Sequence, residues 1–319
     1  MEPFRSLLTG LMLLVAVGCA GWAFAAQGGR WSARLDVLTH FLPMIMGAAA
    51  VTVLYAIFAE PLWAKLALAG FGGAGLVLAG WLIAPEYLAR RALVAADDTP
   101  SQIKVIQLNA WRGNRDPEGT VRWLLAQDAD VIVLQEADIV GPLLKLRSAY
   151  HASCDGCAVV IFSKTKPDLL DTPTPNDKRL GAPAAGVTLR DEQGEFTVIG
   201  THYTWPVHGG LQQSQGRSLA RLLASIPKER LILTGDFNST PWSFSRRRED
   251  AMFGLERLTR GMFTWPARDV PRRGRGTPFP LLPIDHVYAG SGWRTVKVER
   301  GPRTGSDHYP VIVTLAPSP

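Results

Sequence analysis

The sequence has few cysteines, and this scarcity limits how the fold can be held together. Three cysteines occur in 319 residues, which excludes a scaffold built on disulfides. Cys154 and Cys157, in HASCDGCAVV, can form a small loop disulfide or a redox pair. No second CxxC or paired histidine follows at the spacing of a zinc site. We expect a loop pair, oxidised if this part of the chain lies outside the cytoplasm.

A strong excess of positive charge is also missing. Of the 34 basic and 28 acidic residues, six and four lie before Ala92, which leaves 28 and 24 for the rest of the chain. This excess is too small for a nucleic-acid-binding stripe. A solvated loop, or contact with phosphate or anionic lipid, can explain the basic residues that gather late in the chain, namely Arg246, Arg247, Arg248, Arg268, Arg272, Arg273 and Arg275.

Charge is nearly absent from the stretches 7–26, 41–59 and 63–84, where Lys65 is the exception. Each stretch has about the 20 residues that cross a hydrocarbon core as a helix. Buried core helices rarely lack a polar face over such lengths. The sequence therefore predicts three transmembrane helices in a multi-pass inner (plasma) membrane protein.

Tryptophans and glycines agree with a membrane region. Gly70 and Gly73 allow close helix packing. Tryptophans fall near the ends of the predicted helices, as in an interfacial aromatic belt; they are Trp22, Trp31, Trp63 and Trp81.

Two patterns in the sequence bear on the side of the membrane on which the rest of the chain lies, and they point in opposite directions. Ala23-Phe24-Ala25 ends an apolar stretch in the manner of a secretory signal. With the amino terminus inside, Arg5 and Lys65 are the inside basic residues. The opposite orientation has four inside basic residues and favours a cytoplasmic domain; they are Arg30, Arg34, Arg90 and Arg91.

The composition turns polar after the apolar stretches, and this marks a domain boundary. We expect a membrane region over 1–91, a linker over 92–102 and one α/β domain over 103–319. Apolar periodicity predicts strands near 103–109, 130–136, 157–163, 184–190, 195–202, 230–236, 283–289, 294–299 and 310–316, and helices near 117–127, 138–147, 209–226 and 243–255. So many strands with fewer helices indicate two packed sheets flanked by helices.

Polar groups stand at the edges of six of these apolar runs. Turns and caps explain any one of them, but the recurrence favours a single site at the strand ends. The residues are Asn109, Glu136, His202, Asp236 with Asn238, Asp285, and Asp307 with His308.

The segments GDFN, at 235–238, and SDHYP, at 306–310, give the chain a resemblance to the endonuclease/exonuclease/phosphatase superfamily, which includes deoxyribonuclease-I-like nucleases. The resemblance covers about 103–315. It implies a four-layer α/β sandwich and phosphoester hydrolysis with a divalent cation. Similar members with three helices imply a catalytic domain outside the inner membrane, so we expect a periplasmic domain.

The cation expected for this chemistry is Mg²⁺, with Mn²⁺ possible, because a hard cation prefers oxygen ligands. Glu136 is the best candidate ligand, supported by Asn109 and Asp307. Helix capping and turn formation are the alternative roles of these three residues.

The attacking water needs a base, and we expect His308 in that role with Asp285 holding its ring. By resemblance, Asp236 orients the water and Asn238 binds the phosphate. His202 donates a hydrogen bond or a proton on the opposite side. The other histidines are expected to be structural; they are His40, His151, His208 and His286.

The sequence thus predicts a membrane-anchored phosphoesterase. Its partners are the bilayer and a phosphoester, which can be a lipid headgroup, a small phosphoester or nucleic acid; no obligate protein partner is evident. A DNA nuclease of the same superfamily and a catalytically silent binding module are the alternatives.

Overall fold

The structure is a computed structural model that describes residues 2–89, 92, 94–170, 182–267 and 277–318. Arg90 and Arg91 of the charge count lie outside these residues, as do four members of the late basic cluster, Arg268, Arg272, Arg273 and Arg275. The chain forms two compact units. The first comprises Met1–Ala89 and Thr240–Arg247, and the second comprises Arg90–Ser239 and Arg248–Pro319.

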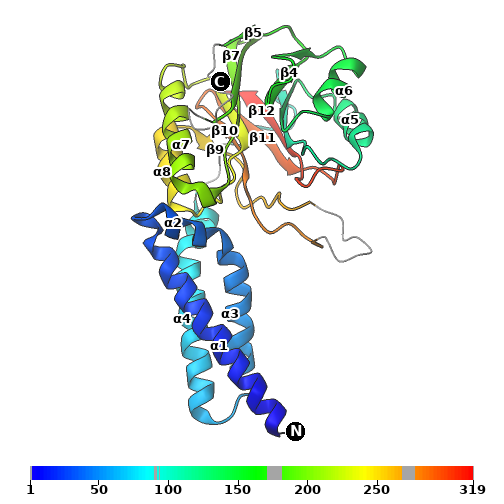
Figure 1. Ribbon diagram of the computed structural model, residues 1–319. Coiled ribbons are helices and arrows are strands. Elements are labelled where there is room, and N and C mark those ends of the chain that lie inside the picture. The colour runs from blue at the N-terminus through cyan, green and yellow to red at the C-terminus, as the bar shows by residue number, and fades with distance from the viewer. Residues whose placement is uncertain (1, 90–91, 93, 171–181, 268–276, 319) are drawn as a thin grey trace. The chain divides into compact units, whose positions relative to one another are not determined.

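The first unit is helical (Figure 1). Its long helices are α1 (Glu2–Gln27), α3 (Leu42–Ala56) and α4 (Leu62–Leu88), and its short ones are η1 (Gly28–Arg30), α2 (Ala33–Asp36) and η2 (Val37–Phe41). The apolar stretches predicted from the sequence coincide with the long helices. By length and composition, three helical segments of the described chain could cross a membrane.

Small residues bring the long helices together, but they are not the predicted Gly70 and Gly73. Nothing lies within 4 Å of a Cβ placed on Gly70 or Gly73. A Cβ on Gly72 would meet Thr52 Oγ1 at 2.5 Å, and one on Gly75 would meet Cys19 at 3.3 Å. The packing surface of α4 is therefore displaced by two residues from the predicted one, because the helix presents Gly72 and Gly75 to its neighbours.

The segment 240–247 belongs to this helical unit although it lies far along the chain. The Asp36 carboxylate accepts hydrogen bonds from the backbone N–H groups of Phe244 and Ser245, each at 2.8 Å, and so caps α8 (Phe244–Phe253). The Trp242 indole N–H donates to the Thr39 carbonyl at 2.8 Å.

Two arginines of the late basic cluster are part of this packing. Arg246 is fully buried, and Arg247 donates a hydrogen bond to the Leu82 carbonyl. The interpretation of a solvated loop is wrong for these two residues, because segment 240–247 packs on the helices. Arg248 is exposed.

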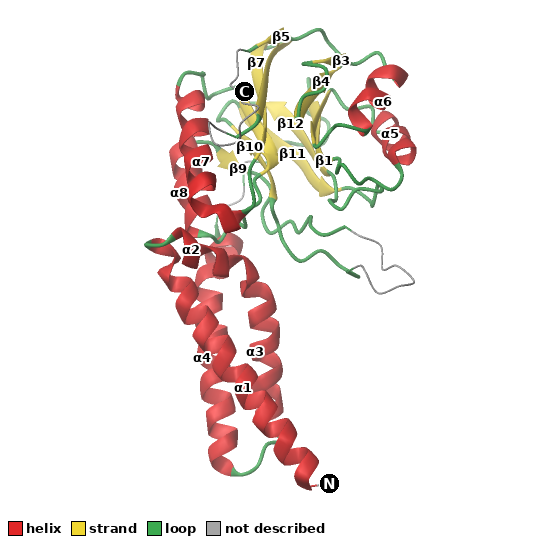
Figure 2. Ribbon diagram, viewed as in Figure 1, coloured by secondary structure: helices red, strands yellow, loops and turns green. Residues whose placement is uncertain are grey.

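The second unit contains two six-stranded sheets (Figure 2). The strands are β1 (Ile103–Asn109), β2 (Val131–Gln135), β3 (His151–Ala152), β4 (Val159–Ser163), β5 (Asp168–Leu169), β6 (Ala184–Asp191), β7 (Gly194–His202), β8 (Leu231–Asp236), β9 (Glu256–Arg257), β10 (Asp285–Ala289), β11 (Trp293–Arg300) and β12 (Val311–Pro317). The first sheet has the order β11-β12-β1-β2-β4-β3, and the second has the order β5-β6-β7-β8-β10-β9.

Side chains that alternate between the two faces of each strand contribute to different core layers. Val105 of β1 joins a core shared with Val198 of β7, whereas Leu108 packs outward. The outer face of the first sheet is covered by α5 (Pro117–Ala126) and α6 (Val140–Arg147). The outer face of the second sheet is covered by α7 (Gly209–Ala224), with Phe253 at the end of α8; η3 (Pro206–His208) precedes α7. This arrangement confirms the predicted four-layer sandwich.

All nine predicted strands and four predicted helices are present, with ends that differ by at most a few residues. The sequence did not predict the two-residue strands β3, β5 and β9. The predicted linker is partly paired, because the Ala95 N–H donates to the Thr295 carbonyl of β11 at 2.9 Å. The predicted domain boundaries stay predictions.

Candidate active site

Parallel pairing in the first sheet aligns two of the predicted residues. Asn109 ends β1 and lies opposite Gln135, the last residue of β2. Glu136 follows Gln135 directly. Because parallel strands end at the same edge of a sheet, Asn109 and Glu136 leave that edge together, and Asn109 Nδ2 lies 3.3 Å from Glu136 Oε1.

The second sheet aligns three more residues. His202 ends β7 opposite Asp236, the last residue of the parallel strand β8. Asp285 begins the antiparallel strand β10 and lies opposite the same Asp236. The register thus places His202, Asp236 and Asp285 side by side on consecutive strands.

Hydrogen bonds join the two edges. Asn109 Nδ2 also donates to Asp236 Oδ2 at 3.0 Å. His202 Nε2 lies 3.6 Å from Asp236 Oδ2 and 3.9 Å from Glu136 Oε1. The side chains of Asn109 and His202 therefore each lie between one carboxylate from the first sheet and one from the second.

His308 lies in the loop before β12, and this loop is fixed to β1. Ser306 Oγ donates to the Asn109 carbonyl at 2.6 Å, and the His308 N–H donates to Ser306 Oγ at 3.0 Å. The His308 ring then bonds Asp285 Oδ2 through Nδ1 at 2.9 Å. Its Nε2 lies 3.7 Å from Asp236 Oδ2 and 4.0 Å from Asp307 Oδ1.

Asn238 is held by the turn that follows β8. Its backbone N–H donates to Asp236 Oδ1 at 2.8 Å, and its Nδ2 donates to the Tyr203 carbonyl at 2.9 Å. The backbone has a φ of 48°, a left-handed conformation that Asn tolerates better than most residues.

All eight residues predicted for the site belong to this one connected set of contacts. The set also contains Gln107, which the sequence analysis missed. Gln107 Nε2 donates to Asp285 Oδ1 at 2.8 Å and to Gln135 Oε1 at 2.8 Å. In the sequence, Gln107 shows only as a polar residue within the apolar run IKVIQLN; its full burial, which calls for hydrogen-bond partners, appears in the structure.

The histidines expected to be structural lie apart from these contacts. His286 Nε2 bonds the Ser239 carbonyl at 2.9 Å, and its ring packs on Phe237. His40 bonds Thr240 Oγ1 at 2.9 Å within the helical unit. His151 and His208 are exposed.

A model of the endonuclease/exonuclease/phosphatase family matches residues 106–308, more than half of the chain and the whole range of the site. The chain belongs to this family. Its members are hydrolases that act on phosphoester bonds, and they generally use divalent metals. No curated protein sequence matches the chain.

Solved structures of the family share the fold. A mannosyl-6-phosphatase of Bacteroides thetaiotaomicron is 16% identical over 67% of this chain and 99% of its own, with a TM-score of 0.54. D. rerio TDP2 with a single-strand DNA product is 16% identical over 68% and 99%, with a TM-score of 0.52. The human Nocturnin catalytic domain with a bound sulfate anion is 18% identical over 73% and 98%, with a TM-score of 0.51. At these identities the likeness establishes the fold.

Two carboxylates in the candidate site are held ionised. Burial opposes the charge on Glu136, but the backbone N–H of Arg112 and the nearby His202 together hold its pKa below the ordinary value. Burial likewise opposes the charge on Asp285, and the charge and hydrogen bond of His308 lower its pKa. Both residues are therefore anions at neutral pH.

The pKa values of Asp236 and His308 are instead raised. Burial, together with the nearby charge of Asp285, raises the pKa of Asp236 to about 7. Burial lowers the pKa of His308, but the charges of Asp285 and Asp236 outweigh it and raise the pKa to about 10. Asp236 is therefore the carboxyl whose pKa lies near neutral pH, and it faces the protonated His308 ring at 3.7 Å.

Two places in the site have the side chains of a metal site. Asp236, Asp285 and His308 present ligand atoms that all lie within 4.8 Å of one another. In this group, however, His308 Nδ1 and Asp285 Oδ2 are already bonded to each other. Glu136 offers the second place, since it is held ionised and its side chain is 25% exposed.

Proposed function

We propose that the protein is a membrane-anchored, divalent-cation-dependent phosphoesterase in which an activated water attacks phosphorus. The observation that carries the proposal is the single connected set of polar side chains drawn from the ends of both sheets. A set with two ionised carboxylates, a facing Asp–His pair and two amides supplies the groups that phosphoester hydrolysis needs.

Glu136 fits a hard cation better than the buried Asp236, Asp285 and His308 group does. Mg²⁺ binds one or two carboxylates and keeps several waters, so its ligand must be ionised and reachable by water. The Arg112 N–H bonds Glu136 Oε2 at 3.2 Å and fixes the carboxylate. We assign Glu136 as the main ligand, supported by Asn109 and Asp307. A bound Mg²⁺ or Mn²⁺ supplies positive charge to the phosphate oxygens.

Asn109 can serve this site in two ways. In the structure its Oδ1 accepts from the Trp111 N–H at 3.0 Å and its Nδ2 faces Glu136 and Asp236. An amide has a donor and an acceptor in one plane, so the turned amide would offer its oxygen as a ligand.

The remaining residues handle the water and the phosphate. Asp236 orients the attacking water, and the proton that the water loses passes to the Asp236–His308 pair. Asp285 holds the His308 ring and favours its charged form. Asn238 and His202 bind phosphate oxygens, with His202 on the side of Glu136.

The helical unit supports membrane anchoring and, with it, a substrate at a bilayer. Large apolar side chains along the helices are exposed, among them Leu7, Leu14 and Trp81, as lipid-facing side chains are. A lipid headgroup or another small phosphoester is therefore the substrate class that we favour. DNA stays the alternative within the family, although the modest basic excess of the second unit does not favour it.

A silent binding module is the alternative outside enzymology. A degenerate member would lose its metal carboxylate or its base first. Glu136, Asp236 and His308 are all present and lie within the connected contacts, which supports an active enzyme.

Hydrolysis of bis(p-nitrophenyl) phosphate by the full-length protein tests the proposal. We expect hydrolysis with Mg²⁺ and none with a chelator. Glu136→Gln removes the ligand charge at nearly constant shape, so activity should fall by at least about 100-fold with the fold intact. Glu195→Gln, at an exposed glutamate of β7, is the matched control. Unchanged Mg²⁺ dependence in Glu136→Gln would remove Glu136 from the metal site.

A panel of phospholipids, sugar phosphates and DNA then separates the substrate classes. Turnover of DNA above both other classes would establish the nuclease alternative. Lack of turnover of every substrate, with bound Mg²⁺, would establish the silent module.

A further inference from the structure

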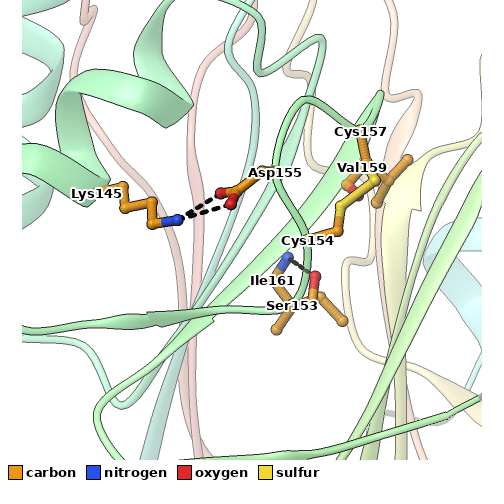
Figure 3. Close-up of a disulfide and its surroundings, with 7 residues drawn as sticks. All are labelled: Lys145, Ser153, Cys154, Asp155, Cys157, Val159 and Ile161. Atoms are coloured by element: carbon orange, nitrogen blue, oxygen red, sulfur yellow. Dashed lines mark hydrogen bonds and ion pairs between the residues drawn. A yellow bond between two sulfur atoms is a disulfide. The ribbon is translucent and has the colours of Figure 1, made fainter.

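A disulfide between Cys154 and Cys157 closes a small loop before β4 (Figure 3). This loop is bonded to the backbone of Glu136. Ala158 follows Cys157 and accepts a hydrogen bond from the Glu136 N–H at 3.0 Å. The next residue, Val159, begins β4 and pairs with Gln135 of β2. The backbone bond that holds the proposed metal ligand is therefore made by the residue directly after the disulfide.

The Glu136 backbone depends on such contacts. Its φ is 47°, a left-handed conformation that residues with a Cβ rarely adopt. Surrounding structure must hold a residue in this conformation, and the N–H bond to Ala158 is one such contact. A shift of Ala158 would therefore move the Glu136 carboxylate.

The other contacts of the loop hold its base, at Ser153 and Ile161, better than its tip, residues 154–157. The Ser153 N–H donates to the Ile161 carbonyl at 2.8 Å, and the Ile161 N–H donates to Ser153 Oγ at 3.0 Å. Beyond this base, Asp155 binds Lys145 at 2.6 and 2.8 Å (Figure 3), and both side chains are more than half exposed. Exposed ion pairs of this kind contribute little to the stability of a fold. The disulfide is therefore the main constraint on the tip of the loop.

The disulfide is also open to attack. Both cysteines are half-buried and line a cavity of about 530 Å³. Asp155 and Gly156 between them are exposed. The same cavity is lined by Ala137, the residue after Glu136. An attacking thiol can approach the sulfurs from this cavity without unfolding the sheets.

We propose that Cys154–Cys157 is a site of thiol–disulfide exchange with a dithiol reductant, and that its reduction weakens cation binding by Glu136. One thiolate of the reductant attacks one cysteine sulfur, the S–S bond breaks, and a mixed disulfide forms. The second thiolate of the reductant displaces the cysteine. The reductant leaves as a disulfide, and the protein gains two electrons and two protons as two thiols.

Reduction releases the loop tip and, through Ala158, the backbone of Glu136. This step rests on the proposed function, because it takes Glu136 as the metal ligand. Contacts that orient a metal ligand typically change metal affinity 10- to 100-fold when lost. We expect the lower end, about 10-fold, since Asn109 and Arg112 still hold the Glu136 carboxylate.

Mn²⁺ binding to the full-length protein in detergent, followed by electron paramagnetic resonance, tests the proposal. The Kd for Mn²⁺ should rise about 10-fold when dithiothreitol reduces the wild type, and two new thiols should titrate in parallel. The double variant Cys154→Ser/Cys157→Ser should bind with the higher Kd whether or not dithiothreitol is present, which also controls for chelation by the reductant. Cys19→Ala, at the buried free cysteine, should respond as the wild type does.

Two results would overturn the proposal. One is the absence of new thiols at reductant concentrations that leave the protein folded, and the other is an unchanged Kd after the thiols appear. Mn²⁺ binding by none of the forms would instead refute the metal site of the proposed function, and the coupling with it. The thiol count would still report whether exchange occurs, so the two failures are distinguishable.

Discussion

Two residues of the site, Glu136 and Asn238, have left-handed backbones with φ of 47° and 48°. Such conformations cost on the order of 1–3 kcal/mol each and persist where surrounding contacts fix them. For Asn238 these contacts come from Asp236 and Tyr203, and for Glu136 from Ala158 and Arg112. With these conformations, the Glu136 side chain lies against Asn109 and His202, and the Asn238 side chain bonds Asp236.

His308 and Asp285 should act as one unit. His308→Ala should lower the rate by about 10² to 10⁴, the size of general acid–base effects, with little change in Mg²⁺ affinity. Asp285→Asn should lower the rate less, because Asp285 acts through the His308 ring, which it holds by a hydrogen bond of 2.9 Å. In the double variant the losses should fall well short of multiplying, as steady-state kinetics of the four proteins would show.

Fully multiplicative losses would mean that the two residues act separately. His286→Ala is not a suitable control, because that ring is buried against Phe237. His208→Ala, at an exposed histidine of η3, is the better comparison and should leave the rate unchanged.

The pH profile should report Asp236. A carboxylate that orients or deprotonates water must be ionised, so kcat/KM should fall as the pH drops through about 7, the raised pKa of Asp236. The charge of His308 lowers that pKa, so His308→Ala should move this acid limb to higher pH. An acid limb near pH 10 that vanishes in His308→Ala would assign the base to His308 instead.

Single residues of the site could be predicted because each one stands where an apolar run begins or ends. The contacts of Asn109 with Glu136 and Asp236 could not, since they depend on how the two sheets meet. Gln107 was missed for the same reason: within its strand it reads as one polar residue among apolar ones, and its partner Asp285 is 178 positions away.

At the scale of the elements, the pairing of β7 with β8 sets the position of both His202 and Asp236. Gly235 lies opposite Thr201 in this pairing, with a φ of 157°. A Cβ at Gly235 would lie 2.0 Å from the Thr201 carbonyl oxygen, which is backbone and cannot turn aside.

Gly235→Ala should therefore destabilise the protein by about 3 kcal/mol, because overpacking against a backbone atom forces the strands apart. Thermal unfolding of the purified full-length protein would measure the effect. Gly210→Ala in α7 is the matched control, since nothing lies within 4 Å of its Cβ, and it should be neutral or slightly stabilising. Equal unfolding temperatures for the two variants would show that the strands can yield.

Periodicity predicted the elements that are long enough to show it. The strands β3, β5 and β9 have two residues each, too few for alternation to appear. The packing of segment 240–247 within the helical unit has no local pattern either. It depends on buried partners such as Asp36 and Thr39, about 200 positions earlier.

At the scale of the whole molecule, two arguments predict opposite sides of a membrane for the second unit. Charge counting favours a cytoplasmic second unit, whereas the family resemblance favours a periplasmic one. We expect a reporter fused after Pro319 to be active as a periplasmic alkaline phosphatase and dark as a cytoplasmic fluorescent protein. Reporters fused after Glu60, between α3 and α4, should give the opposite results. The reason is that α4 lies between the two fusion points and would place them on opposite sides of the membrane. The reverse of both patterns would place the second unit in the cytoplasm.

The division of the site between the two sheets has a consequence for partial unfolding. Asn109 comes from the first sheet, and His202 and Asp236 come from the second; no continuous layer of the sandwich holds all three. A molten state, with its strands still paired but its sheets no longer tightly packed, would separate these side chains by more than hydrogen-bond reach. In mild denaturant, catalysis should therefore be lost before the far-ultraviolet circular dichroism changes, so turnover becomes a sensitive measure of sheet packing in this protein.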